Sequence, residues 1–169
     1  MPSGIEIEPY YVLDYHDWVS VFALDQESNV ILIREYHHGP AVTGVGLPGG
    51  TLNSPDEDPS DGAMRELAEE TGYVAHELID LGPVWANWSN HTNRVHNFLA
   101  LGCTASGTQN LDISEGVSLE LTPFDKVSTQ MFGQSYHRLN AYMAFEWIDR
   151  HQRSGLARTN EVQSSDGGL

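Results

Sequence analysis

The distribution of hydrophobic residues along the chain predicts a β-sheet combined with two helices. Two runs rich in β-branched and aromatic residues, at residues 18–24 and 30–36, flank the polar stretch DQESN. They predict a hairpin whose second strand, apolar at nearly every position, is buried on both faces. A short strand is expected to enter the glycine turn at residues 44–50. Three later runs also have strand character: YVAHELIDLGPVWAN, RVHNFLALGC and VSLELTPF.

The first predicted helix covers residues 59–71 and carries signals at both ends. Asp58 or Ser60 can cap its start, and Pro59 suits its first turn because the proline lacks an N–H that would be unpaired there. Gly72 suits the position after the last turn, where helices often end in a left-handed residue.

A second helix is expected over residues 135–153. Its part between 139 and 148 is apolar on most sides, which indicates deep packing against a sheet or a partner subunit. Strands interleaved with two helices predict a layered α/β domain. We expect this single domain to cover residues 1–155, and the small, polar residues 156–169 to form a disordered tail.

Charge and composition narrow the functional classes. Eight basic and twenty-four acidic residues give a net charge of −16, which disfavours binding to nucleic acids and anionic membranes. A small phosphorylated substrate bound through a metal remains compatible with this charge. The single Cys103 excludes an intrachain disulfide, and no signal peptide or membrane-length apolar run is visible. These features predict a cytoplasmic protein.

Three carboxylates crowd one side of the first predicted helix. Glu66, Glu69 and Glu70 project together, and the opposite side would pack against the sheet through Ala63, Met64, Leu67 and Ala68. Two carboxylates about 4 Å apart repel by roughly 4 kcal/mol at an effective dielectric near 20. Either this is a solvated acidic face, or a divalent cation converts the repulsion into attraction.

The stretch G…E…RELAEETGY resembles the Nudix box, in which a glycine and a glutamate precede Arg-Glu-apolar-x-Glu-Glu-x-Gly-apolar. Glu57 occupies the upstream glutamate position, whereas Thr51 occupies the usual glycine slot and Gly50 lies one residue early. The helix matches in register at Arg65, Glu66, Leu67, Glu69, Glu70, Gly72 and Tyr73. The segments YYVLDYHDWVSVFAL, VILIREYHHG and LPGG resemble the ADP-ribose pyrophosphatase branch, and the likeness runs to about residue 150.

The resemblance implies a fold and an activity. The fold would be an α/β/α sandwich with a mixed sheet between helices. The activity would be hydrolysis of the pyrophosphate bond in ADP-ribose or a similar nucleoside diphosphate sugar, dependent on magnesium or manganese. The products would be a nucleoside monophosphate and a sugar phosphate. Relatives in this branch are commonly homodimers that act on small-molecule nucleotides, so we expect a homodimer here.

The resemblance also implies roles for individual residues. Glu66 and Glu70 would be the main metal ligands, with Glu69 binding directly or through water and taking part in catalysis. The backbone carbonyl of Gly49 resembles a further ligand. Glu115, in the stretch NLDISEGVSLEL, is expected to be the general base or the last ligand. Arg65 is interpreted as a structural partner of Glu69 or Glu57 rather than as a substrate contact.

Substrate contacts are less constrained by the pattern. His37 stands where relatives often carry a phosphate-binding arginine, and Arg34 could supply that cation instead. Trp85 and Trp88, expected in a loop, either stack on a base or pack against the long helix. Hydrolysis of nucleoside triphosphates or dinucleoside polyphosphates is the alternative activity. A non-catalytic nucleotide sensor is the alternative from another class, although such a sensor would be expected to have lost some of the glutamates.

Overall fold

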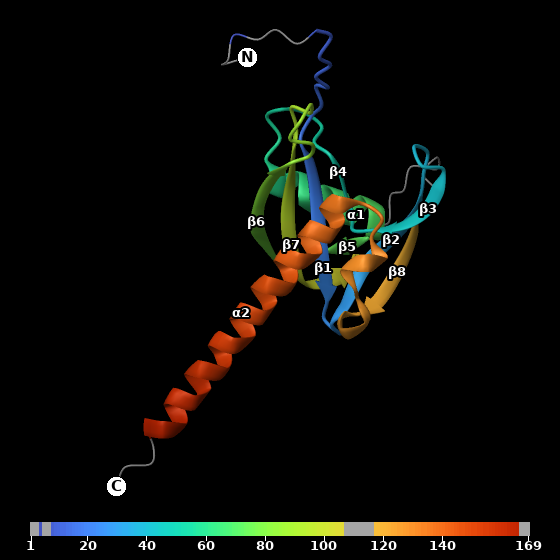
Figure 1. The fold of residues 1–169 in the computed structure, drawn as a ribbon. Helices are drawn as coiled ribbons and strands as arrows, with labels where there is room; N and C mark the ends of the chain where they lie inside the picture. Colours follow the sequence, from blue (N-terminus) through green and yellow to red (C-terminus); the bar gives the residue numbers. More distant parts are fainter. Residues whose placement is uncertain (1–3, 5–7, 107–116, 166–169) are drawn as a thin grey trace.

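The fold centres on strand β1 (Trp18–Asp25), as the computed structural model of residues 4, 8–106 and 117–165 shows (Figure 1). β1 pairs antiparallel with β2 (Asn29–His37) and parallel with β7 (Arg94–Ala105), so the sheet is mixed. This antiparallel pairing confirms the predicted hairpin, whose turn contains Ser28 at φ 64°. Only the first half of β2 is buried as predicted, at residues 30–33, because Arg34 and Tyr36 are exposed.

The remaining strands extend the sheet around this centre. β3 and β8 pair with β2, β4 pairs with β1, and β5 and β6 pair with β7. Two predicted strands are each divided in the structure, at Leu47–Pro48 and at Ala75–His76. The bounds of the five added strands are β3 Val42–Gly46, β4 Gly49–Thr51, β5 Tyr73–Val74, β6 Glu77–Trp85 and β8 Ser118–Pro123.

Helix α1 (Pro59–Thr71) has the predicted bounds and caps. The Asp58 side chain accepts from the Ser60 N–H, and Gly72 adopts φ 73° at the C-terminal cap. Gly62, Ala63, Leu67 and Thr71 are buried. The buried face therefore lies toward the sheet, which leaves the glutamates of the last two turns on the other side.

Helix α2 (Ser135–Ser165) follows two short 3-10 helices, η1 (Phe124–Lys126) and η2 (Thr129–Met131). Its predicted end near residue 153 is too early, and Figure 1 shows the C-terminal half of α2 extending beyond the sheet. The division between a domain ending at residue 155 and a tail at residues 156–169 stays a prediction. Among the described residues, no helix is long and apolar enough to cross a membrane.

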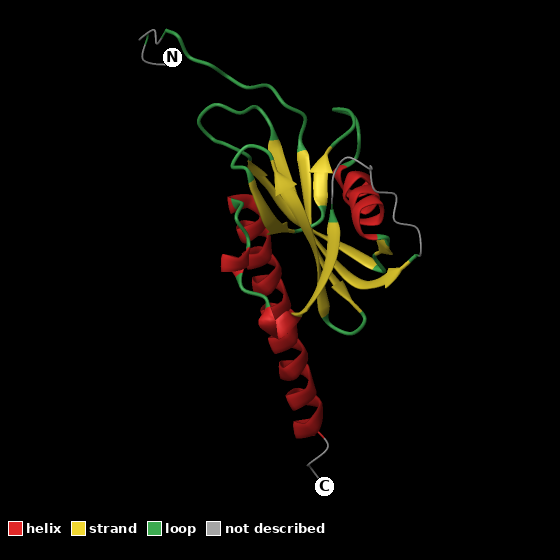
Figure 2. Ribbon diagram, turned by 90° about the vertical axis from the view of Figure 1, so that its right-hand side faces the viewer, coloured by secondary structure: helices red, strands yellow, loops and turns green. Residues whose placement is uncertain are grey.

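The helices cover opposite faces of the sheet (Figure 2). Alternate residues of β1 divide between two apolar clusters, because successive strand side chains point to opposite faces. Val21 packs with Leu67 of α1, whereas Phe22 packs with Ala141 and Ala144 of α2. The predicted α/β/α sandwich with a mixed sheet is thus confirmed.

A small polar cluster lies within the contact between β1 and α2. Asn140 donates from Nδ2 to the Ser20 carbonyl at 2.7 Å, and His137 Nδ1 lies 3.4 Å from Ser20 Oγ. Gly46 leaves room for the ring, since a Cβ there would lie 3.0 Å from His137 Nε2. Burial, with a smaller effect of neighbouring His37, lowers the pKa of His137 to about 3. The buried imidazole is therefore neutral.

This histidine predicts a loss of stability in mild acid. The pKa of His137 is about 3 in the folded chain and 6.5 ordinarily, so the unfolded state binds more protons between these values. The free energy of unfolding should fall as pH decreases through this range, by up to about 1.4 kcal/mol per pH unit. Urea unfolding at neutral pH and at about pH 5 should show a smaller loss for His137→Gln than for the unsubstituted protein. Equal losses would contradict the assignment.

Candidate active site

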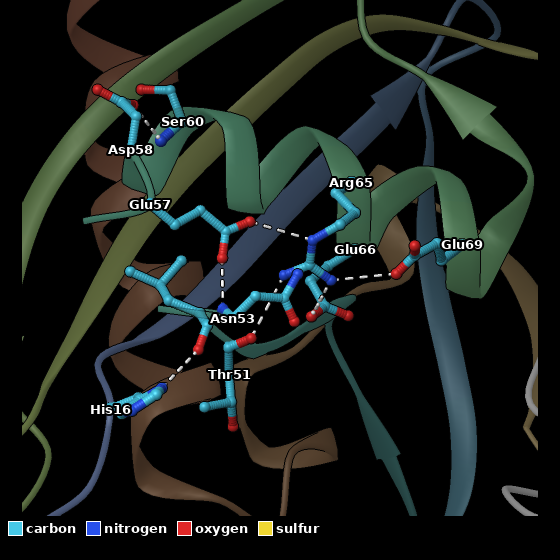
Figure 3. A network of polar contacts seen from close by, with 10 residues as sticks. His16, Thr51, Asn53, Glu57, Asp58, Ser60, Arg65, Glu66 and Glu69 are labelled. Atoms are coloured by element: carbon cyan, nitrogen blue, oxygen red, sulfur yellow. Dashed lines mark hydrogen bonds and ion pairs between the residues drawn. The ribbon is translucent and has the colours of Figure 1, made fainter. Parts of the chain in front are cut away.

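Arg65 lies among the acidic side chains of α1 and the loop before it (Figure 3). Its Nε donates to Glu57 Oε1 at 3.1 Å. Its Nη1 donates to Glu66 Oε1 at 2.8 Å and to Glu69 Oε2 at 3.1 Å. Its Nη2 donates to the Thr51 carbonyl at 3.3 Å. Arg65 is thus a structural partner of Glu57 and Glu69, the two candidates from the sequence, and also of Glu66. It joins the loop to the helix.

Electrostatics reinforce this network. Partial burial acts to lower the pKa of Arg65, but hydrogen bonds to Glu66, Glu57 and Glu69 outweigh it and raise the pKa. The backbone N–H of Asn53, followed by Arg65, lowers the pKa of Glu57 below its ordinary value of 4.5. The guanidinium and the Glu57 carboxylate therefore both stay charged at neutral pH, and the loop is held against the first turns of α1.

Two glycines bring the turn before α1 close to the glutamates. The Gly49 N–H donates to Glu70 Oε2 at 2.8 Å. A Cβ on Gly50 would lie 2.5 Å from Glu66 Oε1, and one on Gly49 would lie 2.2 Å from the Val19 carbonyl oxygen. Neither position can hold a side chain without displacing its neighbour. Gly50 therefore provides the close approach, although it lies one residue before the usual glycine slot.

The carboxylates have the chemistry of a site for a hard divalent cation. Glu66, with 13% of its side chain exposed, and Glu69, with 45%, both pair with Nη1 of Arg65. Among the described residues, no three His, Cys, Asp or Glu side chains already converge as a metal site. Carboxylate and carbonyl oxygens at this turn nevertheless match the ligands that magnesium accepts. The donor set fits such an ion once the side chains reorient, so the roles of Glu66, Glu69, Glu70 and Gly49 stay predictions.

Tyr136, in the first turn of α2, belongs to the same region but was not predicted. Burial, followed by the charges of Glu35 and Glu70, raises its pKa to about 12. Its ring packs against Trp18 of β1, with the ring centroids 5.9 Å apart. Tyr136 is distant from α1 in the sequence, and the only signal was the polar stretch GQSYH before the apolar part of the last helix.

The predicted phosphate contacts already have protein partners. Arg34 Nη2 pairs with Glu120 Oε2 at 2.8 Å, across β2 and β8. His37 Nε2 lies 3.5 Å from Glu35 Oε1. Contact of Arg34 with a phosphate would therefore compete with its ion pair. Glu115, the predicted base, lies outside the described residues.

Trp85 and Trp88 are at the surface. Trp85 ends β6 instead of lying in a loop, and the two side chains are 44% and 84% exposed. Their rings meet edge-on at 6.4 Å, and the Arg94 guanidinium lies 4.9 Å from the centre of the Trp85 ring. This exposure does not fit the alternative in which both indoles pack against α2. Stacking on a base stays a prediction.

The chain is similar to a known domain family and to several known proteins. A family model of the NUDIX domain matches residues 14–142. The chain is 34% identical over 82 residues to the ADP-ribose pyrophosphatase of Bacillus subtilis (strain 168), covering 48% of this chain and 44% of that protein. It is 32% identical over 110 residues to the ADP-ribose pyrophosphatase of Mycobacterium tuberculosis (strain ATCC 25618 / H37Rv), covering 63% and 51%.

A further relative carries a different description. The methanol dehydrogenase activator of Bacillus methanolicus is 31% identical over 106 residues, which cover 62% of this chain and 57% of that protein. The chain spans about half the length of these three relatives. Their activities can therefore guide only a proposal for this protein.

Two solved structures share the fold. The crystal structure of an ADP compounds hydrolase has a TM-score of 0.70 and 22% identity, covering 81% of this chain and 75% of that chain. A NUDIX hydrolase from Nitrosomonas europaea has a TM-score of 0.61 and 19% identity, covering 78% and 89%. The resemblance carried by the glutamate helix is thus confirmed, and because the NUDIX model matches residues 14–142, the chain belongs to the NUDIX domain family.

Proposed function

We propose that this protein hydrolyses the pyrophosphate bond of ADP-ribose or a similar nucleoside diphosphate sugar, using magnesium or manganese. The observation that carries the proposal is the placement of Glu66 and Glu70 against the glycine turn at Gly49 and Gly50. The names of two relatives, both ADP-ribose pyrophosphatases, support the substrate class.

Individual residues have separate roles in the proposed reaction. Glu66, Glu70 and the Gly49 carbonyl would hold the cation, with Glu69 as a direct or water-mediated ligand. A bound divalent cation supplies neutralisation of charge on the pyrophosphate oxygens. Arg65 keeps the glutamates and the loop in place. A water attacks one phosphorus, the bridging P–O bond breaks, and Glu115 takes the proton of the water.

A substrate panel tests this proposal. With magnesium present, ADP-ribose should yield AMP and no inorganic phosphate, and chelation of the metal should abolish the reaction. Release of pyrophosphate from nucleoside triphosphates, with ADP-ribose left intact, would support the alternative activity. Binding of nucleotides without turnover of any compound would support the sensor.

We also propose, from net charge and cysteine content, that the protein is cytoplasmic and binds no nucleic acid. The net charge of −16 repels polyanions, and the single cysteine suits a reducing compartment. A nuclease-free binding assay with DNA and RNA at low salt should detect no complex.

We also propose a homodimer formed through α2. Ala141 and Ala144 face the core, whereas Leu139 and Tyr142, three residues apart on one side, are exposed. Sedimentation at micromolar concentration should give twice the chain mass of 18.7 kDa. Tyr142→Lys should shift the equilibrium toward monomer, and Tyr11→Lys, at an exposed tyrosine remote from α2, should not. A single species near 18.7 kDa for the unsubstituted protein would refute the dimer.

A further inference from the structure

A pocket of about 280 Å³ opens between the β2–β3 hairpin and the segment before α2. Ligand pockets commonly measure about 300–1,000 Å³. This one therefore has room for a single ring system rather than for a whole dinucleotide. It is lined by His37, Pro40, Val42, Val45, Gly133 and Gln134, among others.

The polar edge of this pocket is continuous with the candidate active site. Gln134 Nε2 lies 3.3 Å from both ring nitrogens of His37, and Gln134 precedes Tyr136 by two residues at the start of α2. The Tyr136 ring packs against Trp18 of β1, and the same strand pairs with β4 at Gly49, whose N–H donates to Glu70. A substrate whose pyrophosphate lies at Glu70 can therefore extend past Tyr136 toward the pocket.

The chemistry of the lining favours one class of ligand group. Pro40, Val42 and Val45 offer apolar surface to the faces of a flat ring. The amide of Gln134 has two N–H donors and a carbonyl acceptor, the combination that pairs with the edge of a nucleobase. No Lys, Arg, Asp or Glu is among the described residues that line the pocket, and His37 is the one ionisable side chain in that lining.

We propose that this pocket binds the nucleobase of the substrate and that Gln134 hydrogen-bonds the edge of the base. The inference rests on the proposed function, because it assumes that the pyrophosphate lies at the glutamates of α1. It places the base away from the exposed pair Trp85 and Trp88, so the two assignments give opposite results in one experiment.

Two glycines provide a matched test of the pocket. At both Gly133, which lines the pocket, and Gly39, which is not among its lining residues, an added Cβ would meet nothing within 4 Å. AMP and ribose 5-phosphate serve as probes, since they share a phosphorylated ribose and differ in the base. Calorimetry should show that the unsubstituted protein binds AMP more tightly than it binds ribose 5-phosphate. Gly133→Leu should weaken the binding of AMP by at least about tenfold and leave the affinity for ribose 5-phosphate unchanged. Gly39→Leu should change neither affinity.

Further variants keep the test decisive if Gly133→Leu does not fold. Gln134→Ala should weaken AMP selectively, and Gln134→Glu should change the order of preference among AMP, GMP and CMP. Unchanged AMP affinity in the folded Gln134 variants, together with weaker AMP binding in Trp88→Ala, would overturn the pocket and favour the indoles. These affinities are measured on products, without turnover. A protein that fails to hydrolyse ADP-ribose but loses AMP binding in Gln134→Ala would therefore refute the proposed function and support the pocket.

Discussion

Glu70→Gln should lower kcat by at least about 10²-fold at saturating magnesium, because cation-based charge stabilisation contributes several kcal/mol to the barrier. The amide removes the negative charge that the cation needs. It can still accept the Gly49 N–H, a bond of 2.8 Å in the structure, through its Oε1. Folding should therefore be nearly intact, and the thermal midpoint should stay close to that of the unsubstituted protein. Steady-state kinetics and thermal unfolding on the same preparations measure both effects.

Glu77→Gln is the matched control. Glu77 begins β6 and is exposed, so the same change of charge occurs away from α1. Its kcat should be unaltered. Full turnover by Glu70→Gln at saturating magnesium would remove Glu70 from the mechanism, and an equal loss in both variants would indicate an effect of net charge alone.

Glu115→Gln should cost about 10²–10⁴-fold in kcat if Glu115 is the general base. The glutamates of α1 are assigned to the cation, so the proton of the attacking water needs another acceptor. Glu115 precedes Gly116 and lies shortly before β8 in the sequence. KM and stability should change little, because the substitution keeps the size of the side chain. The pH dependence of kcat/KM should also lose its acidic limb.

Two nearby carboxylates provide the comparison for Glu115. Asp112→Asn should leave kcat close to its original value. Glu120→Gln should remove the surface ion pair with Arg34 and leave the chemical step intact. A loss below about threefold in Glu115→Gln, well under the range expected for a general base, would transfer the role to Asp112 or to a mechanism without a side-chain base.

Local signals in the sequence were sufficient for α1 and its immediate contacts. Asp58 and Gly72 act at the helix ends through their own backbone neighbourhood, so their roles are visible in a few residues. The partners of Arg65 lie within fourteen residues of it, at Thr51, Glu57, Glu66 and Glu69. The hairpin of β1 and β2 was predicted for the same reason, because its turn and both strands are contiguous.

Features that depend on distant segments were not predictable in this way. The break between β3 and β4 arises because β3 pairs with β2 and β4 pairs with β1. The run GVGLPGG carries no local signal that its two parts have different partner strands. The packing of Tyr136 against Trp18 joins the start of α2 to β1, which is far away in the sequence. The parallel pairing of β1 with β7 likewise joins segments far apart in the sequence.

The close approach of Gly50 to Glu66 shows that the space beside this carboxylate matters more than the exact spacing of the glycine in the motif. A Cβ at position 50 would lie 2.5 Å from the Glu66 carboxylate, so this position favours a glycine. The glycine stands one residue earlier here than in the usual pattern. A search that fixes the distance between the glycine and Glu57 would pass over this chain, although its helix is complete. The loop can therefore gain a residue during evolution without rebuilding the site, whereas Gly50→Ala, the smallest possible change of side chain, cannot be accommodated unless Glu66 moves.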